Sequence, residues 1–323
     1  MARLSAFQAD YPGSNPGLRI FKMEQETQEN TKKFEKFYNK SYKKMLLIPV
    51  ILVLLSLIVI GSFYSKNGDF FQKDISLTGG TSITLYEETD ILSLEEALFP
   101  QLEDLNTRGI YDVVTREQKA VILETKTEGE TTKQIVEDYL GYELTEENSS
   151  FEFTGSTLSE SFYKQLLIAI LIAFVFMGLV VFIIFRTFIP SSAVIISAFA
   201  DILMTLAVVD ILGIKMSSAG IVAFLMLIGY SVDTDILLTT RILKRREGKI
   251  NSRLFEAFKT GITMTGTSLV AMIVALLIVN SFSLVLSQIF TILVIGLGFD
   301  ILNTWVTNAS IIKWYTHKKE GKE

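Results

Sequence analysis

The chain has 323 residues, a formal net charge of −5, no cysteine and one histidine. Its hydrophobic content of 49% and mean hydropathy of +0.39 exceed those of an ordinary soluble globular protein. The missing cysteines exclude disulfides, thiolate chemistry and cysteine metal sites, and the single histidine, His317 near the C-terminus, excludes histidine-based catalysis elsewhere in the chain.

The first 44 residues contain no apolar run long enough to cross a membrane. Residues 1–22, with the run Tyr11-Pro-Gly-Ser-Asn-Pro-Gly17, have no hydrophobic period. We therefore expect residues 1–22 to be disordered or an artefact of the assigned start site, and we give them no role. We expect residues 1–44 as a whole to form a cytoplasmic tail.

Six apolar stretches are long enough to span a bilayer, whose hydrocarbon core of about 30 Å needs roughly 20 helical residues. The first lies far from the N-terminus and lacks a small-residue cleavage site, so we expect a retained anchor. The pattern predicts a polytopic α-helical membrane protein, with residues 164–312 holding helices two to six. The expected spans are residues 45–63, 165–185, 189–212, 218–240, 262–281 and 288–312.

Lysine and arginine gather at one set of helix ends, which in membrane proteins marks the cytoplasmic side. With six spans, all of these segments fall on the same side of the membrane. We therefore expect a multi-pass protein of the cell membrane with both termini in the cytoplasm and residues 313–323 as a cytoplasmic tail. The residues are Lys32, Lys33, Lys36, Lys40, Lys43, Lys44, Arg186, Arg241, Lys244, Arg245, Arg246, Lys249, Arg253, Lys313, Lys318, Lys319 and Lys322.

Residues 64–163, between the first two spans, form the one loop long enough to be a domain. Strand patterns at 82–86, 111–115, 120–125 and 150–154 alternate with helix patterns, the first capped by Ser93 with Glu96 at its third position and the second over 131–140. The order βαββαβ predicts a ferredoxin-like α+β extracytoplasmic domain. Two interpretations of its 21 acidic and 7 basic residues stay open. The charge either solvates the domain, or it docks a basic partner or leaves an open sheet edge for an extended polypeptide to join.

Carboxyl groups lie within the predicted spans. Asp201 and Asp300 fall near the middle of helices three and six, and Asp233 and Asp235 lie nearer the cytoplasmic end of helix four. Such residues are costly in a membrane and usually face a bundle interior or a water path. Polar neighbours share their helix faces, in the sets Ser197, Asp201, Thr205; Ser231, Asp235, Thr239; and Asp300, Asn303, Thr304, Thr307, Asn308.

Two interpretations of these groups remain open. Serine, threonine and asparagine can act only as hydrogen-bonding contacts between helices. A carboxyl group buried without a cation can instead take up and release a proton, and no lysine or arginine lies at the depth of Asp201 or Asp300. We expect proton coupling through Asp201, Asp233, Asp235 and Asp300, with Arg241 at the inner end of helix four as the nearest mobile cation.

Several motifs resemble SecF, the smaller partner of SecD in the protein-export accessory complex and a member of the resistance-nodulation-division superfamily. The similarity begins at about Phe34 and covers nearly all of the remaining chain. The motifs are Asp74-Ile-Ser-Leu-Thr-Gly-Gly-Thr81, Thr154-Gly-Ser-Thr-Leu158, Ala200-Asp201-Ile-Leu-Met-Thr-Leu206, and Gly229-Tyr-Ser-Val-Asp-Thr-Asp235 followed by Arg241.

This resemblance implies a role for several residues. It makes Asp201 the proton carrier, with Arg241 modulating it, and makes Asp74, Gly79, Gly80 and Thr81 a motif coupling the outside domain to helix one. The polar faces of helices three, four and six would line the interface with SecD. Asp233 stands where bacterial members carry asparagine, and the run Gly298-Phe-Asp-Ile-Leu-Asn303 also departs from the bacterial pattern, so the chain resembles archaeal members.

The implied function is to assist polypeptide translocation through the Sec channel, driven by proton flow. Expected partners are SecD, the Sec translocon channel, the translocating polypeptide and membrane lipid; we expect no nucleic acid, cofactor, metal or enzyme activity. No phosphate-binding loop occurs for ATP hydrolysis. Alternatives are a proton-driven exporter of lipid or small molecules and an intramembrane aspartyl protease, although Gly296-Leu-Gly-Phe-Asp300 has one residue too many for the protease signature Gly-x-Gly-Asp.

Overall fold

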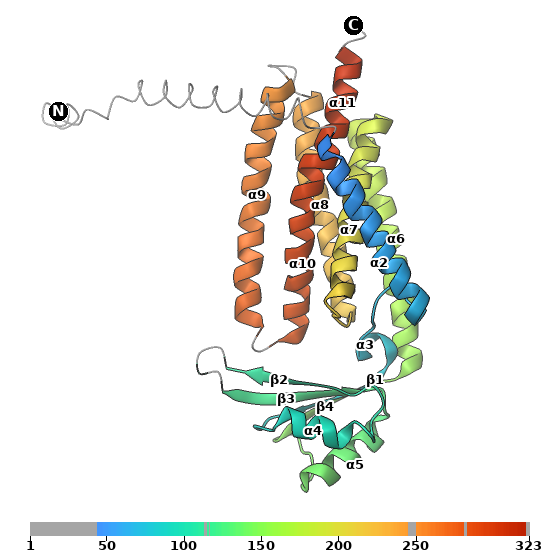
Figure 1. Ribbon diagram of the computed structural model, residues 1–323, viewed down its shortest axis with the longest axis vertical. Coiled ribbons are helices and arrows are strands. Elements are labelled where there is room, and N and C mark those ends of the chain that lie inside the picture. The colour runs from blue at the N-terminus through green and yellow to red at the C-terminus, as the bar shows by residue number, and fades with distance from the viewer. Residues whose placement is uncertain (1–43, 113–114, 116, 245–249, 281–282, 321–323) are drawn as a thin grey trace, which may run out of the picture.

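The computed structural model describes residues 44–112, 115, 117–244, 250–280 and 283–320. A bundle of long helices stands on a small α+β domain (Figure 1). The tail prediction for residues 1–43, the C-terminal residues 321–323 and the basic residues at 245–249 lie outside the described ranges.

Six helical stretches are long and apolar enough to cross a membrane, which confirms the predicted number of spans. The fifth begins at Ile250 and the second at Leu158, both earlier than predicted, because each helix continues beyond its apolar stretch into polar residues. The helices are α2 (Leu47–Asn67), α6 (Ser156–Phe185), α7 (Phe188–Ile211), α8 (Ser218–Lys244), α9 (Ile250–Val279), and a last span made of α10 (Leu284–Leu302), the π-helical turn η1 (Asn303–Asn308) and α11 (Ala309–Glu320).

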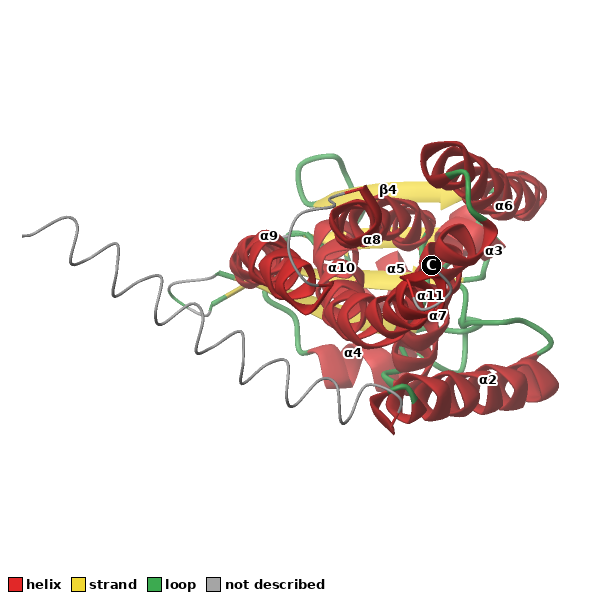
Figure 2. Ribbon diagram, turned by 90° about the horizontal axis from the view of Figure 1, so that it is seen from above, coloured by secondary structure: helices red, strands yellow, loops and turns green. Residues whose placement is uncertain are grey.

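Helices α7 and α8 form the centre of the bundle. In each, 56% of the most apolar window is buried, against 6% in α6 and 11% in α9. Seen along the bundle, α7, α8 and α10 lie between α9 on one side and α2 and α6 on the other (Figure 2). The polar faces predicted on helices three, four and six are therefore turned into this chain's own interior.

The outside domain has the element order β1 (Gly80–Leu85), α4 (Ile91–Leu98), β2 (Asn106–Tyr111), β3 (Gln118–Thr125), α5 (Gly129–Leu140) and β4 (Ser149–Thr154). Its four strands are antiparallel in the order β2-β3-β1-β4. This arrangement confirms the predicted ferredoxin-like α+β domain between the first two spans.

The sheet separates the membrane bundle from the two domain helices (Figure 1). Strand alternation sends one set of side chains from β1 and β3 toward α4 and α5, where they form an apolar core. Polar side chains from the other face, including Arg108 and Glu124, point toward the bundle side. The core residues are Ile83, Leu85, Leu94, Leu98, Leu102, Leu105, Val121, Leu123, Val136 and Leu144.

Two local predictions in this domain were wrong. The residue capping α4 is Asp90, whose side chain accepts from the Leu92 N–H, while Ser93 lies inside the helix and donates to Asp90 Oδ2 at 2.5 Å. Strand β2 covers Asn106–Tyr111 rather than 111–115, because Asn106 pairs with Glu124 and so sets the register against β3. Residues 113–114 lie outside the described ranges.

Candidate functional site

Three carboxyl groups lie at the centre of the bundle. Asp201 of α7, Asp235 of α8 and Asp300 of α10 all have side chains with 0% exposure. Their helices pack directly against one another, which explains why the polar stripes of the sequence meet. The cluster therefore joins three of the four aspartates predicted within the spans.

Asp201 is held by one donor on each carboxylate oxygen. Ser231 donates its hydroxyl to Oδ2 at 2.6 Å, and Asn303 donates an amide N–H to Oδ1 at 2.7 Å. These donors come from α8 and from the π-helical turn. Asp201 thus ties the three central helices together through hydrogen bonds to a charged or partly charged acceptor.

Asp235 and Asp300 have fewer donors. Asn308 donates to Asp235 Oδ1 at 2.7 Å, and Thr304 donates to Asp300 Oδ1 at 3.2 Å. The Oδ2 atoms of Asp235 and Asp300 are buried and have no hydrogen-bond partner among the described residues. Each of these oxygens is available to carry a proton.

No cation neutralises the cluster within the described part of the chain, where every ion pair lies elsewhere. Three ionised carboxylates cannot coexist at such depth, because burial and mutual repulsion both disfavour the charged form. Among the described residues, no group of three or more acidic or histidine side chains is placed to hold a metal ion.

The other predicted residues of helix four lie apart from this cluster. Asp233 is exposed on the opposite side of α8, on a face that other described elements do not cover. Arg241 donates from Nη1 to the Glu256 carbonyl at 3.0 Å and so joins the C-terminal end of α8 to the first half of α9. Among the described residues, no hydrogen bond or ion pair joins Arg241 to Asp201.

The predicted coupling motif lies where the outside domain meets the membrane bundle. Asp74 caps the short helix α3 (Ile75–Thr78) by accepting from the Ile75 N–H at 2.8 Å. Thr81 donates to the Thr127 carbonyl within the domain. At Gly79, with a φ of +82°, an added Cβ would lie 2.5 Å from the Ser156 backbone. The motif therefore contacts the start of α6, the second span.

A second connection was not predicted. The loop between α7 and α8 forms a parallel β-bridge in which Met216 pairs with Lys73. The Asp74 N–H donates to the Met216 carbonyl at 2.9 Å, and the Met216 N–H donates to the Gln72 carbonyl at 2.6 Å. This contact could not be predicted, since a single bridge has no periodic pattern in the sequence.

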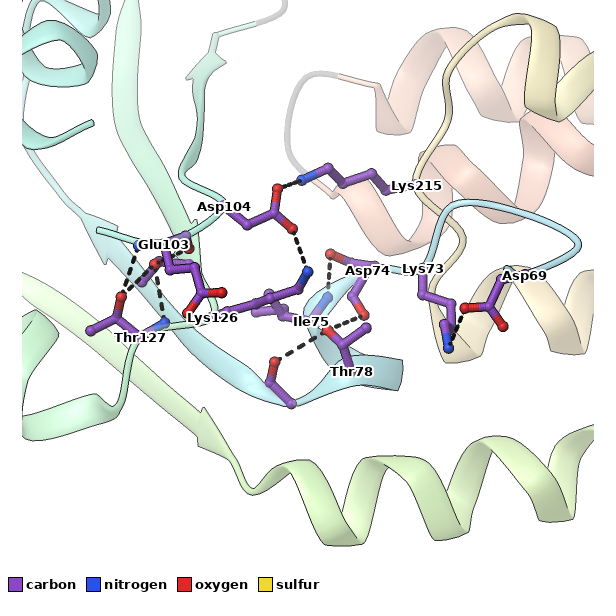
Figure 3. Close-up of polar contacts among 12 residues, drawn as sticks. Asp69, Lys73, Asp74, Ile75, Thr78, Glu103, Asp104, Lys126, Thr127 and Lys215 are labelled. Atoms are coloured by element: carbon purple, nitrogen blue, oxygen red, sulfur yellow. Dashed lines mark hydrogen bonds and ion pairs between the residues drawn. The ribbon is translucent and has the colours of Figure 1, made fainter. Parts of the chain in front are cut away.

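Side chains reinforce that loop on both sides. Gln288, at the start of α10, donates to the Lys215 carbonyl and accepts from the Ser217 hydroxyl and N–H. On the domain side, Lys215 pairs with Asp104, which also pairs with Lys126 at 3.1 Å (Figure 3). The loop thus contacts α10 and the outside domain at once.

Two carboxyl groups at this junction are tuned by their surroundings. Burial raises the pKa of Asp74, opposed by the Ile75 N–H and by the charge of Arg108. Burial also raises the pKa of Glu124, the charge of Asp74 adds to the effect, and Arg108 opposes it through an ion pair. The junction therefore contains acids that bind protons more readily than exposed ones.

Comparison with known proteins gives three results. A family model described as protein export membrane protein SecD/SecF, C-terminal, matches residues 135–318. The protein-export membrane protein SecF of Methanocaldococcus jannaschii is 39% identical over 292 residues, covering 88% of this chain and 99% of that protein. The SecF of Methanothermobacter thermautotrophicus is 39% identical over 281 residues, covering 85% and 93%.

The fold is similar to the crystal structure of SecDF, a translocon-associated membrane protein from a Thermus species, with a TM-score of 0.66 and 18% identity. That match covers 86% of this chain and 38% of the SecDF chain. At this identity the likeness concerns the fold alone. The compared chain is much the longer of the two.

Proposed function

This chain belongs to the SecF family of protein-export membrane proteins, and from this premise we propose that it couples proton movement through the membrane to polypeptide translocation through the Sec channel. Membership of this family confirms the resemblance that the sequence motifs indicated. It also confirms that the chain is a transport accessory protein rather than an enzyme. The observation that carries the proposal is the buried cluster of Asp201, Asp235 and Asp300, which lacks a cation within the described residues.

Protonation of this cluster would act on the helices that carry it. Adding or removing one proton changes which carboxyl groups repel each other and which donors they accept. A shift of α7, α8 or the last span follows, because hydrogen bonds between these helices hold Asp201 and Asp235. The transmembrane potential supplies about 2.3 kcal/mol per charge for each 100 mV.

The loop after α7 supplies a route from that shift to the outside domain. Met216 is bonded to the chain entering the domain, and Gln288 bonds the same loop to α10. All three aspartate-bearing helices therefore end, on the outer side, at or beside the loop that holds the domain. This supports transmission of cluster movements to the part that would contact the emerging polypeptide.

A SecD partner is supported by the surface of α8. Asp233 is exposed near the middle of a membrane-spanning helix, and an added Cβ at Gly229 on the same face meets nothing within 4 Å. A carboxyl group facing lipid is costly, so this face requires a partner with polar or cationic groups. We assign Asp233 to the SecD interface rather than to the proton-binding cluster.

The expected orientation follows from the same arrangement. Arg241, Lys244, Lys318 and Lys319 lie at the helix ends opposite the domain. Positive residues favour the cytoplasmic side, so the acidic domain faces outward and the described C-terminal helix ends in the cytoplasm. An aspartyl protease is less compatible, because both oxygens of Asp201 are engaged by Ser231 and Asn303.

The test is proton-gradient-dependent translocation of a polypeptide into vesicles that hold this chain and its SecD partner. Asp201→Asn should abolish the stimulation by the gradient while the complex still assembles. Asp210→Asn is the matched control, because Asp210 lies on the same helix but outside the cluster. Full stimulation in Asp201→Asn, or equal loss in both variants, would contradict the proposal.

A further inference from the structure

The last span changes helical geometry beside the carboxylate cluster. Between α10 and α11, residues Asn303–Asn308 form a π-helical turn, in which the Ala309 N–H donates to the Thr304 carbonyl five residues earlier. π-helical turns are rare, appear mostly as single turns inside α-helices and often occur at functional sites. Its presence here needs a reason.

The reason lies in the two amide side chains at its ends. Asn303 and Asn308 are five positions apart, and in an α-helix of 3.6 residues per turn they would point about 140° apart. The wider turn reduces this angle and so brings the two amides toward the same side of the helix. Both amides then donate at 2.7 Å to carboxylates on different helices, Asn303 to Asp201 and Asn308 to Asp235.

The donors are unequally shared among the three aspartates. Among the hydrogen bonds of the described residues, Asp201 accepts an amide and a hydroxyl, Asp235 accepts an amide, and Asp300 accepts the Thr304 hydroxyl at the longer distance of 3.2 Å. Donors aimed at a carboxylate favour its ionised form, and neighbouring negative charges disfavour it. Asp300 has the weakest donor and lies within electrostatic reach of the other two aspartates.

We propose that Asp300 is the carboxyl group that bears the proton in this conformation, and that Asn303 and Asn308 are positioning residues whose amide donors favour the ionised forms of Asp201 and Asp235. The proposal deepens the proposed function and rests on it for what the proton does. The protonation pattern itself can be tested without translocation.

The geometry also supplies a step for proton transfer. The Ser231 hydroxyl, which donates to Asp201, also lies beside Asp300. Asp300 gives its proton to Ser231 Oγ while Ser231 gives its own hydrogen to Asp201 Oδ2. Asp300 becomes the carboxylate, Asp201 becomes the carboxylic acid, and Ser231 ends as it began.

Infrared difference spectroscopy of the full chain in lipid bilayers tests the assignment, because a protonated carboxyl group has its own C=O stretching band. The wild-type minus Asp300→Asn spectrum at neutral pH should contain that band. The wild-type minus Asp201→Asn spectrum should lack it. A band that survives in Asp300→Asn and disappears in Asp201→Asn or Asp235→Asn would overturn the proposal.

Two further variants test the positioning role. Asn303→Ala and Asn308→Ala each remove one donor, so a second carboxyl group should become protonated and the band should grow about twofold. Thr316→Val is the matched control, since Thr316 is buried in α11 but donates only to the Ile312 carbonyl. An unchanged band in both asparagine variants would show that the amides only pack the helices together.

The two proposals fail in different ways. If wild-type translocation does not respond to a gradient while the Asp300 band is present, the coupling function is wrong and the protonation pattern stands. If translocation depends on the gradient but the band belongs to another aspartate, the assignment of Asp300 is wrong and the function stands.

Discussion

Lys215 Nζ lies 3.5 Å from Asp104 Oδ1, and this ion pair joins the loop between two membrane helices to the outside domain. The two side chains are partly exposed, at 24% and 42%. Asp104 also pairs with Lys126 of its own domain, so it lies between two cations. The pair is therefore a polar contact across the junction, placed beside the Met216 bridge.

Breaking the ion pair between Lys215 and Asp104 should reduce gradient-stimulated translocation more than it reduces the free energy of unfolding. We expect a double-mutant cycle on Lys215→Ala and Asp104→Asn to give an interaction free energy of about 0.2–1 kcal/mol, because the pair is solvated. Gradient-stimulated translocation should fall in Lys215→Ala. Lys119→Ala, which breaks a pair with Asp112 inside the domain, is the control and should leave translocation unchanged.

Gly79→Ala should destabilise the junction. The residue has a φ of +82° and its added Cβ would lie 2.5 Å from the Ser156 Cα, so backbone strain of about 1–3 kcal/mol adds to a collision with backbone. Thermal unfolding in lipid would measure the loss. Gly155→Ala, where nothing lies within 4 Å of the added Cβ, should remain close to wild type. Equal melting temperatures for both variants would contradict the close approach.

The stability of the outside domain should depend on pH through Glu124. Its pKa is raised by burial, so the folded chain binds this proton more tightly than the unfolded chain. Unfolding free energy should therefore decrease as pH rises from the ordinary value near 4.5 through the raised pKa. Glu124→Gln should flatten that decline. Glu152→Gln, at an exposed position of β4, should retain it.

The packing of α9 against the π-helical turn should not tolerate a larger side chain at Gly261. An added Cβ at Gly261 would lie 2.3 Å from the Trp305 ring, in the middle of the turn. Gly261→Ala should cost about 1–3 kcal/mol, as overpacking usually does. It should also reduce gradient-driven translocation, because Trp305 must move. Gly266→Ala, with open space around its Cβ, is the control on the same helix; if it behaves identically, helix propensity rather than packing explains the effect.

Much of this architecture could be predicted because membrane helices and alternating strands leave strong patterns in a sequence. Asp201, Asp235 and Asp300 were identifiable because charges are rare in apolar runs. The place where these three residues meet was harder to predict. The family resemblance implied that their polar faces line the interface with a partner, whereas the structure buries them within one chain. The cap at Asp90 was missed because Ser93 with Glu96 matches a capping box one turn later.

Structural features that depend on a single contact or on one extra residue could not be predicted, because they leave no periodic pattern in the sequence. The asparagines of the last span were visible as a polar stripe, but an α-helical stripe and a π-helical turn have the same composition. The bridge between Met216 and Lys73 and the ion pair between Lys215 and Asp104 each join segments more than 100 residues apart in the sequence. Only tertiary packing determines such contacts.

The π-helical turn also constrains how the sequence can change over evolution. A π-turn contains one residue more than the α-helical turn in its place, so losing a residue between Asn303 and Asn308 would rotate all of α11 by about 100°. Ile312 and Ala309, now buried against α8 and α9, would turn away with it. Selection should therefore act against insertions and deletions in this segment even where substitutions accumulate. The length of the segment should be more constrained among related proteins than the identity of its residues.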